Sequence, residues 1–253
     1  MNKVAILISG TGSNAAKICE SCLKNEINAK VVCVGSDNIE ARGLEYAKKN
    51  NIHTFVIDYK KIISNYNSNS DKFKLPADFD YENINKKLMF CPVKDREKYL
   101  KTRVSAENEL LEQIMEFEPD LLVLAGFMRT LTPYFIDRFS PDPDNPKIMN
   151  IHPALLPSFP GTDGYGDTFD YGCKVGGCTV HFVDYGTDTG PIILQKSFEI
   201  LPGDSIENVR KKGIELEWQT YPLAVKLYFD KKIKIIESLK KGVKRKKVQI
   251  SLD

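Results

Sequence analysis

The fold is decided by residues 4–15, which read VAILISGTGSNA. The continuous apolar run at 4–8 predicts a strand covered on both faces, because a half-exposed strand would alternate apolar and polar residues. The glycines at positions 10 and 12 suit a tight turn, and a helical pattern begins after them. A buried strand, a glycine-rich turn and a helix are together typical of the first unit of a parallel α/β sheet.

Further apolar runs indicate how this sheet continues. Runs of the same kind lie at 31–34, 55–57, 121–125 and 148–151, and helical patterns separate them. Residues 178–183 and 191–200 predict two more strands, and a long helix is expected at about 205–229. The sequence therefore predicts an α/β fold with a doubly wound, mostly parallel sheet and helices on both faces.

The 253 residues, 42% of them hydrophobic, can bury a full core, so we expect a single domain over 1–253. Residues 59–102 are rich in Asn, Lys, Asp and Tyr, and their weak periodicity predicts an insertion or long surface connection, mobile in part. A helix is predicted at about 105–117, with Ser105 as its N-cap. A basic C-terminal extension starts at about 231, and its run at 240–247 is more typical of a solvated end than of a nucleic-acid arm.

The overall charge argues against two classes of partner. With 36 basic and 34 acidic residues the net charge is +2, which creates no field to gather nucleic acid or a membrane surface. Apolar runs stay shorter than the ~18 residues of a membrane span, and we expect a soluble, cytoplasmic protein. Of six cysteines, Cys19 and Cys22 form a CxxC pair expected on one helix, and all six are expected to be reduced, structural thiols.

The glycine loop at 9–15 has three interpretations. Backbone N–H groups at a helix start favour an anion such as phosphate, and Ser13 and Asn14 add side-chain donors. The loop also fits Gly-x-Gly-x-x-Ala, and Asp37 falls where a dinucleotide enzyme places its ribose-binding acid. The third interpretation is a tight turn without a ligand. The loop alone does not decide between them.

A second motif, NIHPALLP at 150–157, carries groups suited to carbonyl chemistry. Asn150 and His152 are two residues apart on one predicted strand, so their side chains lie on the same face. Asp188 lies in the loop DYGTDTGP at 184–191. An amide donor, an imidazole and a carboxylate can together stabilise a carbonyl oxygen that becomes negative during attack, which predicts acyl-type transfer. Of the other histidines, we expect His181 to be packed in the core or next to substrate, with core packing favoured, and His53 to lie at the surface.

Separated segments now point to one family. They read ISGTGSN at 8–14, LAGFMRTL at 124–131, NIHPALLPSFPG at 150–161 and GCTVHFV at 177–183, followed by the Asp188 loop. In this order they closely resemble the phosphoribosylglycinamide formyltransferases of de novo purine synthesis. The resemblance runs from residue 1 to about 230 and is interrupted by 59–102.

The resemblance implies a fold of the formyltransferase type and an enzyme that moves the formyl group of 10-formyltetrahydrofolate to the amine of glycinamide ribonucleotide. It implies small-molecule substrates, no metal, no nucleic acid, no membrane, and a monomer or homodimer. Asn150, His152 and Asp188 would be catalytic. Asn150 would also bind the folate, and Arg103 would lie near its glutamate tail.

The remaining site residues also follow from the resemblance. Glu217 would bind the ribose hydroxyls of the ribonucleotide. Asp184 would belong to the loop over the pteridine, formed by 184–188. The residues expected to hold the phosphate are Gly12, Ser13 and Asn14, and those expected to line the folate pocket are Met128, Arg129, Thr130 and Leu131.

The chain departs from the family after Gly161, where many members carry histidines and this chain reads TDGYGDTF at 162–169. We expect this change to alter substrate contacts or loop packing rather than the chemistry. The alternatives are a formyltetrahydrofolate deformylase or another folate-dependent N-formyltransferase. A nucleotide-binding regulatory module without turnover is a third hypothesis. Deformylases of this kind carry an extra N-terminal domain, and an initiator-tRNA formylase would need a larger basic C-terminal domain than this extension.

Overall fold

A seven-stranded sheet forms the centre of the computed structural model, which describes residues 1–89, 93–240 and 242–251. Its strands are β1 (Asn2–Ile8), β2 (Ala29–Ser36), β3 (His53–Val56), β4 (Leu121–Leu124), β5 (Ile148–His152), β6 (Val175–Phe182) and β7 (Ile192–Glu199). They lie in the order β3-β2-β1-β4-β5-β6-β7. Strands β1 to β5 pair in parallel, and β6 runs antiparallel to both neighbours. The predicted mostly parallel sheet is confirmed.

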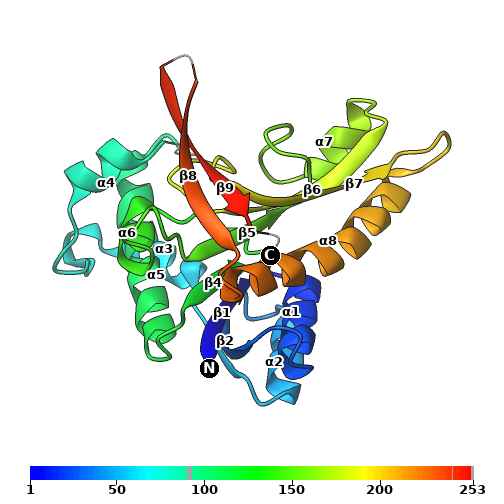
Figure 1. Ribbon diagram of the computed structural model, residues 1–253. Helices are drawn as coiled ribbons and strands as arrows, with labels where there is room; N and C mark the ends of the chain where they lie inside the picture. Colours follow the sequence, from blue (N-terminus) through cyan, green and yellow to red (C-terminus); the bar gives the residue numbers. More distant parts are fainter. Residues whose placement is uncertain (90–92, 241, 252–253) are drawn as a thin grey trace.

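Helices cover both faces of this sheet (Figure 1). One face is covered by α1 (Ser13–Leu23), α2 (Gly43–Lys49) and α8 (Ile206–Phe229), and the other by α3 (Tyr59–Ser68), α4 (Tyr81–Lys87), α5 (Arg96–Met115) and α6 (Pro133–Phe139). Alternate residues of β1 enter different cores: Val4, Ile6 and Ile8 face α1 and α8, and Ala5 and Leu7 face α5 and α6. Because both faces are buried, β1 has no polar alternation.

The segment 59–102 is more regular than its sequence indicates. It contains α3, a short 3-10 helix at Ser70–Lys72, α4 and the start of α5, and residues 90–92 lie outside the described residues. The helix predicted to start at Ser105 in fact begins at Arg96, with the Asp95 side chain accepting a hydrogen bond from the N–H of Lys98. The predicted N-cap was wrong because residues 96–104 bury only a narrow face of the helix. The many charged residues among them make the helical apolar period weak in the sequence.

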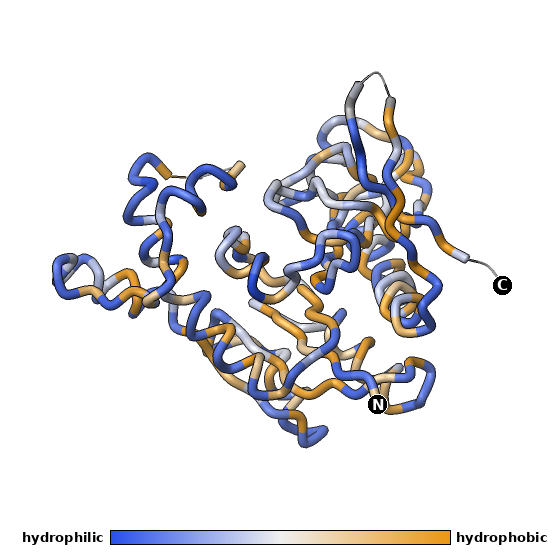
Figure 2. The backbone as a smooth tube through the Cα atoms, turned by 60° about the vertical axis from the view of Figure 1, so that its left-hand side comes forward, coloured by the Kyte–Doolittle hydropathy of each residue, from blue (hydrophilic) through white to orange (hydrophobic). Residues whose placement is uncertain are grey.

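The C-terminal extension is a β-hairpin, and Lys244, Arg245 and Lys247 of its basic run are exposed, in keeping with the expected solvated segment. Strands β8 (Ile233–Lys240) and β9 (Val243–Ile250) pair antiparallel. Ile233, Ile235 and Val248 pack against the core under α1 and α8. Side chains alternate between the two faces of a strand, so one apolar face of the hairpin is partly buried although the segment is basic. In Figure 2 the hydrophobic stretches gather in the middle of the molecule, whereas much of the projecting hairpin is hydrophilic. The assignment of 1–253 to one domain stays a prediction.

Two smaller expectations concern single elements. Cys19 and Cys22 both lie on α1, as predicted, and Cys91 falls outside the described residues. Within 1–89, 93–240 and 242–251, none of the helices combines the length and apolar character needed to cross a membrane.

Candidate active site

A pocket lies at the carboxyl ends of β1 and β4, where the chain leaves β1 toward one face of the sheet and leaves β4 toward the other. In open α/β sheets, ligands bind at this switch point. The pocket has a volume of about 250 Å³ and is lined by residues 9–14 of the glycine loop together with Ala125, Gly126 and Met128. Gly12 has a φ of 67°, and a Cβ on it would lie 2.7 Å from the Cα of Gly43. Only glycine fits there, and helix α1 begins directly after it without a side-chain cap.

Asp37 does not face this pocket as a ribose-binding acid. Its Oδ2 accepts a hydrogen bond from Nε of Arg129 at 2.5 Å, and its Oδ1 accepts one from Oγ of Ser9 at 2.5 Å. Its side chain is only 5% exposed. The Oγ of Ser9 also accepts from the N–H of Met128 at 2.9 Å. Asp37 therefore ties the β1 and β4 loops together, which removes the residue on which the dinucleotide interpretation depended.

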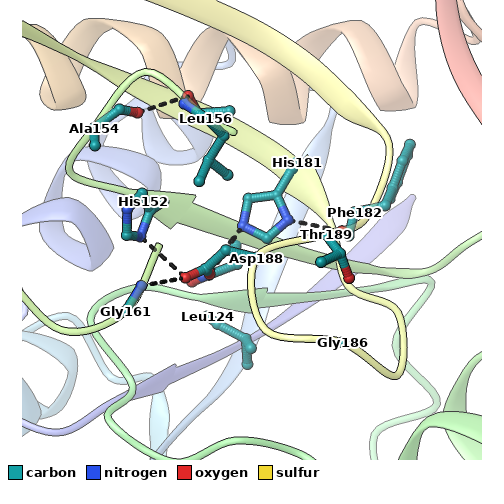
Figure 3. Close-up of polar contacts among 12 residues, drawn as sticks. Leu124, His152, Ala154, Leu156, Gly161, His181, Phe182, Gly186, Asp188 and Thr189 are labelled. Carbon is teal, nitrogen blue, oxygen red and sulfur yellow. Dashed lines mark hydrogen bonds and ion pairs between the residues drawn. The ribbon is translucent and has the colours of Figure 1, made fainter. Parts of the chain in front are cut away.

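The predicted catalytic residues come together next to this pocket. Asn150 and His152 lie on β5, and Asp188 lies in the loop between β6 and β7. Nδ1 of His152 is 3.4 Å from Oδ2 of Asp188. His181 on β6 joins them: its Nε2 is 3.6 Å from Oδ1 of Asp188 and 3.4 Å from Nδ2 of Asn150. Figure 3 shows both imidazoles turned toward the Asp188 carboxylate.

His181 is buried in the core, at 2% exposed, and it also lies beside the predicted catalytic residues. The antiparallel register places His181 directly opposite Asn150, and residues paired in this way share one face of a sheet. The register was not readable from the sequence, although the strand itself was. Nδ1 of His181 donates to the carbonyl of Phe182 at 2.8 Å, which fixes the ring with Nε2 toward the site.

The Asp188 carboxylate is held in its ionised form. Burial alone would raise its pKa, but hydrogen bonds from His181 and from the N–H of Gly161, together with the charge of His152, lower the pKa of Asp188 below its usual value. The Gly161 N–H lies 3.0 Å from Oδ2. Asp188 also has a φ of 55°, a left-handed conformation that an aspartate adopts at some cost. The loop is therefore shaped to present this carboxylate to two histidines.

His152 is 2% exposed and faces an acceptor on each side. Its Nε2 donates to the carbonyl of Phe159 at 2.7 Å, and its Nδ1 faces Asp188. Burial lowers the pKa of His152, while Asp188 and the Phe159 carbonyl act in the opposite direction. Asp188 thus favours the imidazolium, as expected, but burial outweighs it. The protonated ring becomes favourable when further negative charge develops beside it.

Asp188→Asn is expected to lower the pKa of His152 further, because it removes the carboxylate charge that partly offsets burial. An NMR pH titration of the histidine ring signals measures this directly. Asp170→Asn changes an exposed acid on α7 (Gly164–Asp170) and should leave the titration unchanged. An unchanged or raised His152 pKa in Asp188→Asn would mean that Asp188 does not tune this ring.

Glu217 lies on α8 and reaches the glycine loop. It is 7% exposed, and its Oε2 accepts a hydrogen bond from Nδ2 of Asn14 at 2.7 Å. Its Oε1 accepts one from Oη of Tyr165 at 2.7 Å. Burial raises the pKa of Glu217, and these two hydrogen bonds oppose the rise. The structure therefore joins two predicted substrate residues, Asn14 and Glu217, and adds Tyr165, which sequence reasoning had not assigned.

The residues expected to bind folate are arranged around the β4 loop. Met128 is 62% exposed beside the pocket, Thr130 is exposed, and Leu131 is buried in the core on the α5 and α6 side. Arg129 pairs with Asp37, as described above. In the loop after β6, Oδ1 of Asp184 accepts from the N–H of Gly186 at 3.0 Å and from Oγ1 of Thr189 at 2.6 Å. Asp184 therefore closes its own loop.

Two charged residues of α5 make contacts inside the fold. The guanidinium of Arg103 lies 5.2 Å from the ring centroids of both Tyr59 and Tyr99, and its Nη1 is buried without a hydrogen-bond partner. Glu107, which sequence reasoning missed, is fully buried and accepts from the N–H of Thr132 at 2.8 Å and from its hydroxyl. Burial raises the pKa of Glu107 to about 7. No sequence pattern marks Glu107, since it resembles an ordinary helix-surface acid. In the parts of the chain that the structure describes, His, Cys, Asp and Glu form no group of three able to hold a metal ion.

Comparisons with known proteins agree with this geometry. The family model described as formyl transferase matches residues 2–225. The phosphoribosylglycinamide formyltransferase of Haemophilus influenzae is 33% identical over 239 residues, which cover 94% of this chain and 92% of the relative. That of Escherichia coli is 31% identical over 93% of this chain and 91% of the relative.

Solved structures give the same result. The glycinamide ribonucleotide transformylase 1 of Symbiobacterium toebii superimposes with a TM-score of 0.72 at 30% identity, covering 99% of this chain and 94% of that chain. The phosphoribosylglycinamide formyltransferase of Anaplasma phagocytophilum superimposes with a TM-score of 0.71 at 30% identity, covering 100% of this chain and 96% of that chain. The chain therefore belongs to the formyl transferase family, as an enzyme of the phosphoribosylglycinamide formyltransferase type.

Proposed function

We propose that this chain transfers the formyl group of 10-formyltetrahydrofolate to the amine of N1-(5-phospho-D-ribosyl)glycinamide in de novo purine biosynthesis. The products are the N2-formyl ribonucleotide and tetrahydrofolate. The observation that carries the proposal is the convergence of Asn150, His152, His181 and Asp188 beside a glycine loop at the switch point of the sheet. A carbonyl site next to an anion site suits a phosphorylated amine as the acceptor.

The ribonucleotide would bind along the glycine loop. The first N–H groups of α1 and the hydroxyl of Ser13 would hold the phosphate, since this helix start carries no side-chain cap. Gly12 lets the backbone approach the phosphate closely. Asn14 would act through Glu217, to which its amide is hydrogen bonded, and Glu217 would accept from the ribose hydroxyls.

The residues present also fit a formyl folate. This co-substrate supplies a formyl carbon that an amine can attack. Met128, apolar and exposed beside the pocket, would contact its ring system, with the other loop residues 129–131 and the Asp184 loop near it. The buried, unpartnered Nη1 of Arg103 is an unused cationic donor, which suits the carboxylate of a glutamate tail. These assignments are proposals.

The chemistry needs a donor to the formyl oxygen and a route for one proton. A C–N bond forms between the acceptor amine and the formyl carbon, and the bond from that carbon to the folate nitrogen breaks. The amine loses one proton and the departing nitrogen gains one. Asn150 would donate its amide N–H to the formyl oxygen, and His152 would donate as an imidazolium once its Nε2–H leaves the Phe159 carbonyl. Asp188, ionised and beside both rings, would relay the amine proton through water toward the departing nitrogen.

His181 would position this group. Because it contacts both Asn150 and Asp188, its ring would keep the amide and the carboxylate in fixed relative orientation. The proposal requires no metal, since the donors and the proton acceptor are side chains of the chain itself. A cytoplasmic location and a monomer or homodimer are part of the same proposal.

The competing functions differ in their acceptor. Water as the acceptor would make a formyltetrahydrofolate deformylase, and another amine would make a different N-formyltransferase. The test is a spectrophotometric assay of folate product release from 10-formyl folate with and without glycinamide ribonucleotide. Release only with the ribonucleotide is the expected result. Release without it would favour the deformylase, and no release under either condition would contradict the proposed transfer.

A further inference from the structure

The segment in which this chain lacks the family's histidines places a tyrosine on Glu217. Tyr165, near the start of α7, donates its hydroxyl to Oε1 of Glu217 at 2.7 Å. Tyr165 and Glu217 are 5% and 7% exposed, so the hydrogen bond is shielded from water. A buried hydrogen bond to a carboxylate is charge-assisted and fixes the orientation of its acceptor.

Glycines on both sides make room for this tyrosine. A Cβ on Gly213 of α8 would lie 2.2 Å from Cζ of Tyr165, so a side chain there would displace the ring. A Cβ on Gly164 would lie 2.7 Å from the carbonyl oxygen of Pro153, which directly follows His152. The ring of Phe198 lies beside Tyr165 with 6.2 Å between ring centroids. Tyr165 is therefore seated between α8 and the catalytic segment, with little freedom to turn away.

The rest of the segment fixes α7 against α8. Asp163 caps α7 by accepting from the N–H of Gly166 at 3.2 Å, and its carboxylate also accepts from Nη2 of Arg210 at 2.8 Å. A Cβ on Gly166 would overlap the Asp163 carboxylate, at 2.3 Å from its Oδ2. Residues 163–166 thus form one unit that holds Tyr165 over Glu217.

The Glu217 carboxylate keeps free acceptor sites for a ligand after its hydrogen bonds with Tyr165 and Asn14 are counted. An ionised carboxylate has about four acceptor sites, two on each oxygen. Tyr165 occupies one site on Oε1, and Asn14 occupies one on Oε2. One acceptor site therefore remains on each oxygen. A vicinal ribose diol has two hydroxyl donors, which matches this remaining pair.

We propose that Tyr165 is a positioning residue for the ribonucleotide. Its hydroxyl, together with Asn14, holds the Glu217 carboxylate so that each oxygen accepts from one ribose hydroxyl. This inference rests on the proposed function, in which Glu217 binds the ribose. It also assigns a role to the departure from the family motif: the segment at 163–166 replaces histidines with a tyrosine support for the ribose-binding acid.

Because Glu217 must be charged to bind the ribose, the affinity for the ribonucleotide should depend on pH. Burial raises the pKa of Glu217, and the hydrogen bonds from Tyr165 and Asn14 lower it. Glu217 must be ionised to accept from both hydroxyls, so affinity for the ribonucleotide should fall as the pH falls through this pKa. Removal of the Tyr165 hydroxyl raises the pKa further, and the loss of affinity should then begin at a higher pH. Cys178 on β6 and Tyr221 on α8 also lie near this carboxylate, but their hydrogen bonds go to Thr220 and to backbone carbonyls.

The test is isothermal titration calorimetry of glycinamide ribonucleotide against the folate-free protein. Tyr165→Phe keeps the ring and removes the hydroxyl, and should weaken binding by about tenfold, the cost of one hydrogen bond to a charged group. The weakening should increase as the pH is lowered, because Glu217 loses its charge earlier in the variant. Tyr171→Phe, which alters a tyrosine at the C-terminal end of α7 that is 80% exposed, is the matched control and should bind like the wild type.

An analogue that lacks both ribose hydroxyls separates positioning from folding. Wild type and Tyr165→Phe should bind this analogue equally, because Glu217 then has nothing to accept. Gly213→Ala, which crowds the ring while leaving its hydroxyl, should weaken ribonucleotide binding in the same hydroxyl-dependent way. In turnover, the KM for the ribonucleotide should rise while kcat and the KM for formyl folate stay close to the wild-type values.

Two results would overturn the inference while leaving the proposed function intact: unchanged ribonucleotide affinity in Tyr165→Phe, or equal weakening for the analogue without hydroxyls. A wild-type protein that binds the ribonucleotide but shows no preference for the ribose hydroxyls would also overturn it. A wild-type protein that binds no ribonucleotide would instead contradict the proposed function, and the inference with it.

Discussion

His152→Ala is expected to lower kcat by about a thousandfold, since the ring would serve both as a donor to the formyl oxygen and in proton transfer. The ring is 2% exposed and held between the Phe159 carbonyl and Asp188, so its orientation is fixed before the reaction. The affinity for the ribonucleotide should change by no more than a few-fold, because the glycine loop and Glu217 are untouched. Steady-state kinetics and calorimetric binding measure the two effects separately.

His53→Ala is the matched control for this experiment. His53 is an exposed histidine of β3 that packs near Phe117, with 4.9 Å between ring centroids, and contacts none of the site residues. It should leave kcat unchanged. Retained turnover in His152→Ala would exclude the assigned role, and ribonucleotide binding without any turnover in the wild type would favour the regulatory module.

Asn150→Ala is expected to lower kcat by about 100- to 1000-fold, or roughly 2.7 to 4 kcal/mol of transition-state stabilisation. The amide supplies a donor that is already oriented, because its Nδ2 lies 3.4 Å from Nε2 of His181 across the β5 and β6 pair. A donor fixed in this way needs no reorganisation as negative charge develops. The KM for the ribonucleotide should stay within a few-fold, since Asn150 acts on the formyl oxygen.

The control for Asn150→Ala is Asn145→Ala, an exposed asparagine whose amide donates to Asp142 at 2.6 Å, before β5 begins. Kinetics of both variants should show the loss only at position 150. If Asn150→Ala raised KM for both substrates with kcat unchanged, its role would be uniform binding, and the assignment as an oxyanion donor would be wrong.

Most of the sheet was predictable because burial on two faces leaves a direct trace in the sequence. All five apolar runs from 4–8 to 148–151 are parallel strands, and Ser205 caps the long helix α8. Helix α5 was misplaced, since its first turns bury only a narrow face. The hairpin was missed for a similar reason: alternating lysines hide the residues that pack on the core.

The site was predictable where one residue type has a strong chemical meaning. Asn150, His152 and Asp188 stood out because amide, imidazole and carboxylate groups in that pattern suit a carbonyl. His181 and Glu107 did not stand out, because the role of each depends on a contact with a residue that is distant in the sequence. His181 depends on the register of β5 with β6, and Glu107 on the packing of α5 beneath Thr132.

The sequence by itself determined which segments form buried strands, where the glycine turn lies and which family the chain resembles, because these depend on local patterns and on short, continuous motifs. The tertiary structure alone decided which side chains meet: Asp37 with Arg129 rather than a ribose, His181 with Asp188, and Tyr165 with Glu217. Two of these contacts join residues 92 and 52 positions apart, and the third joins a strand to the loop that follows it. Their partners are set by strand register and helix packing, which are collective properties of the whole core and leave no pattern in any one segment.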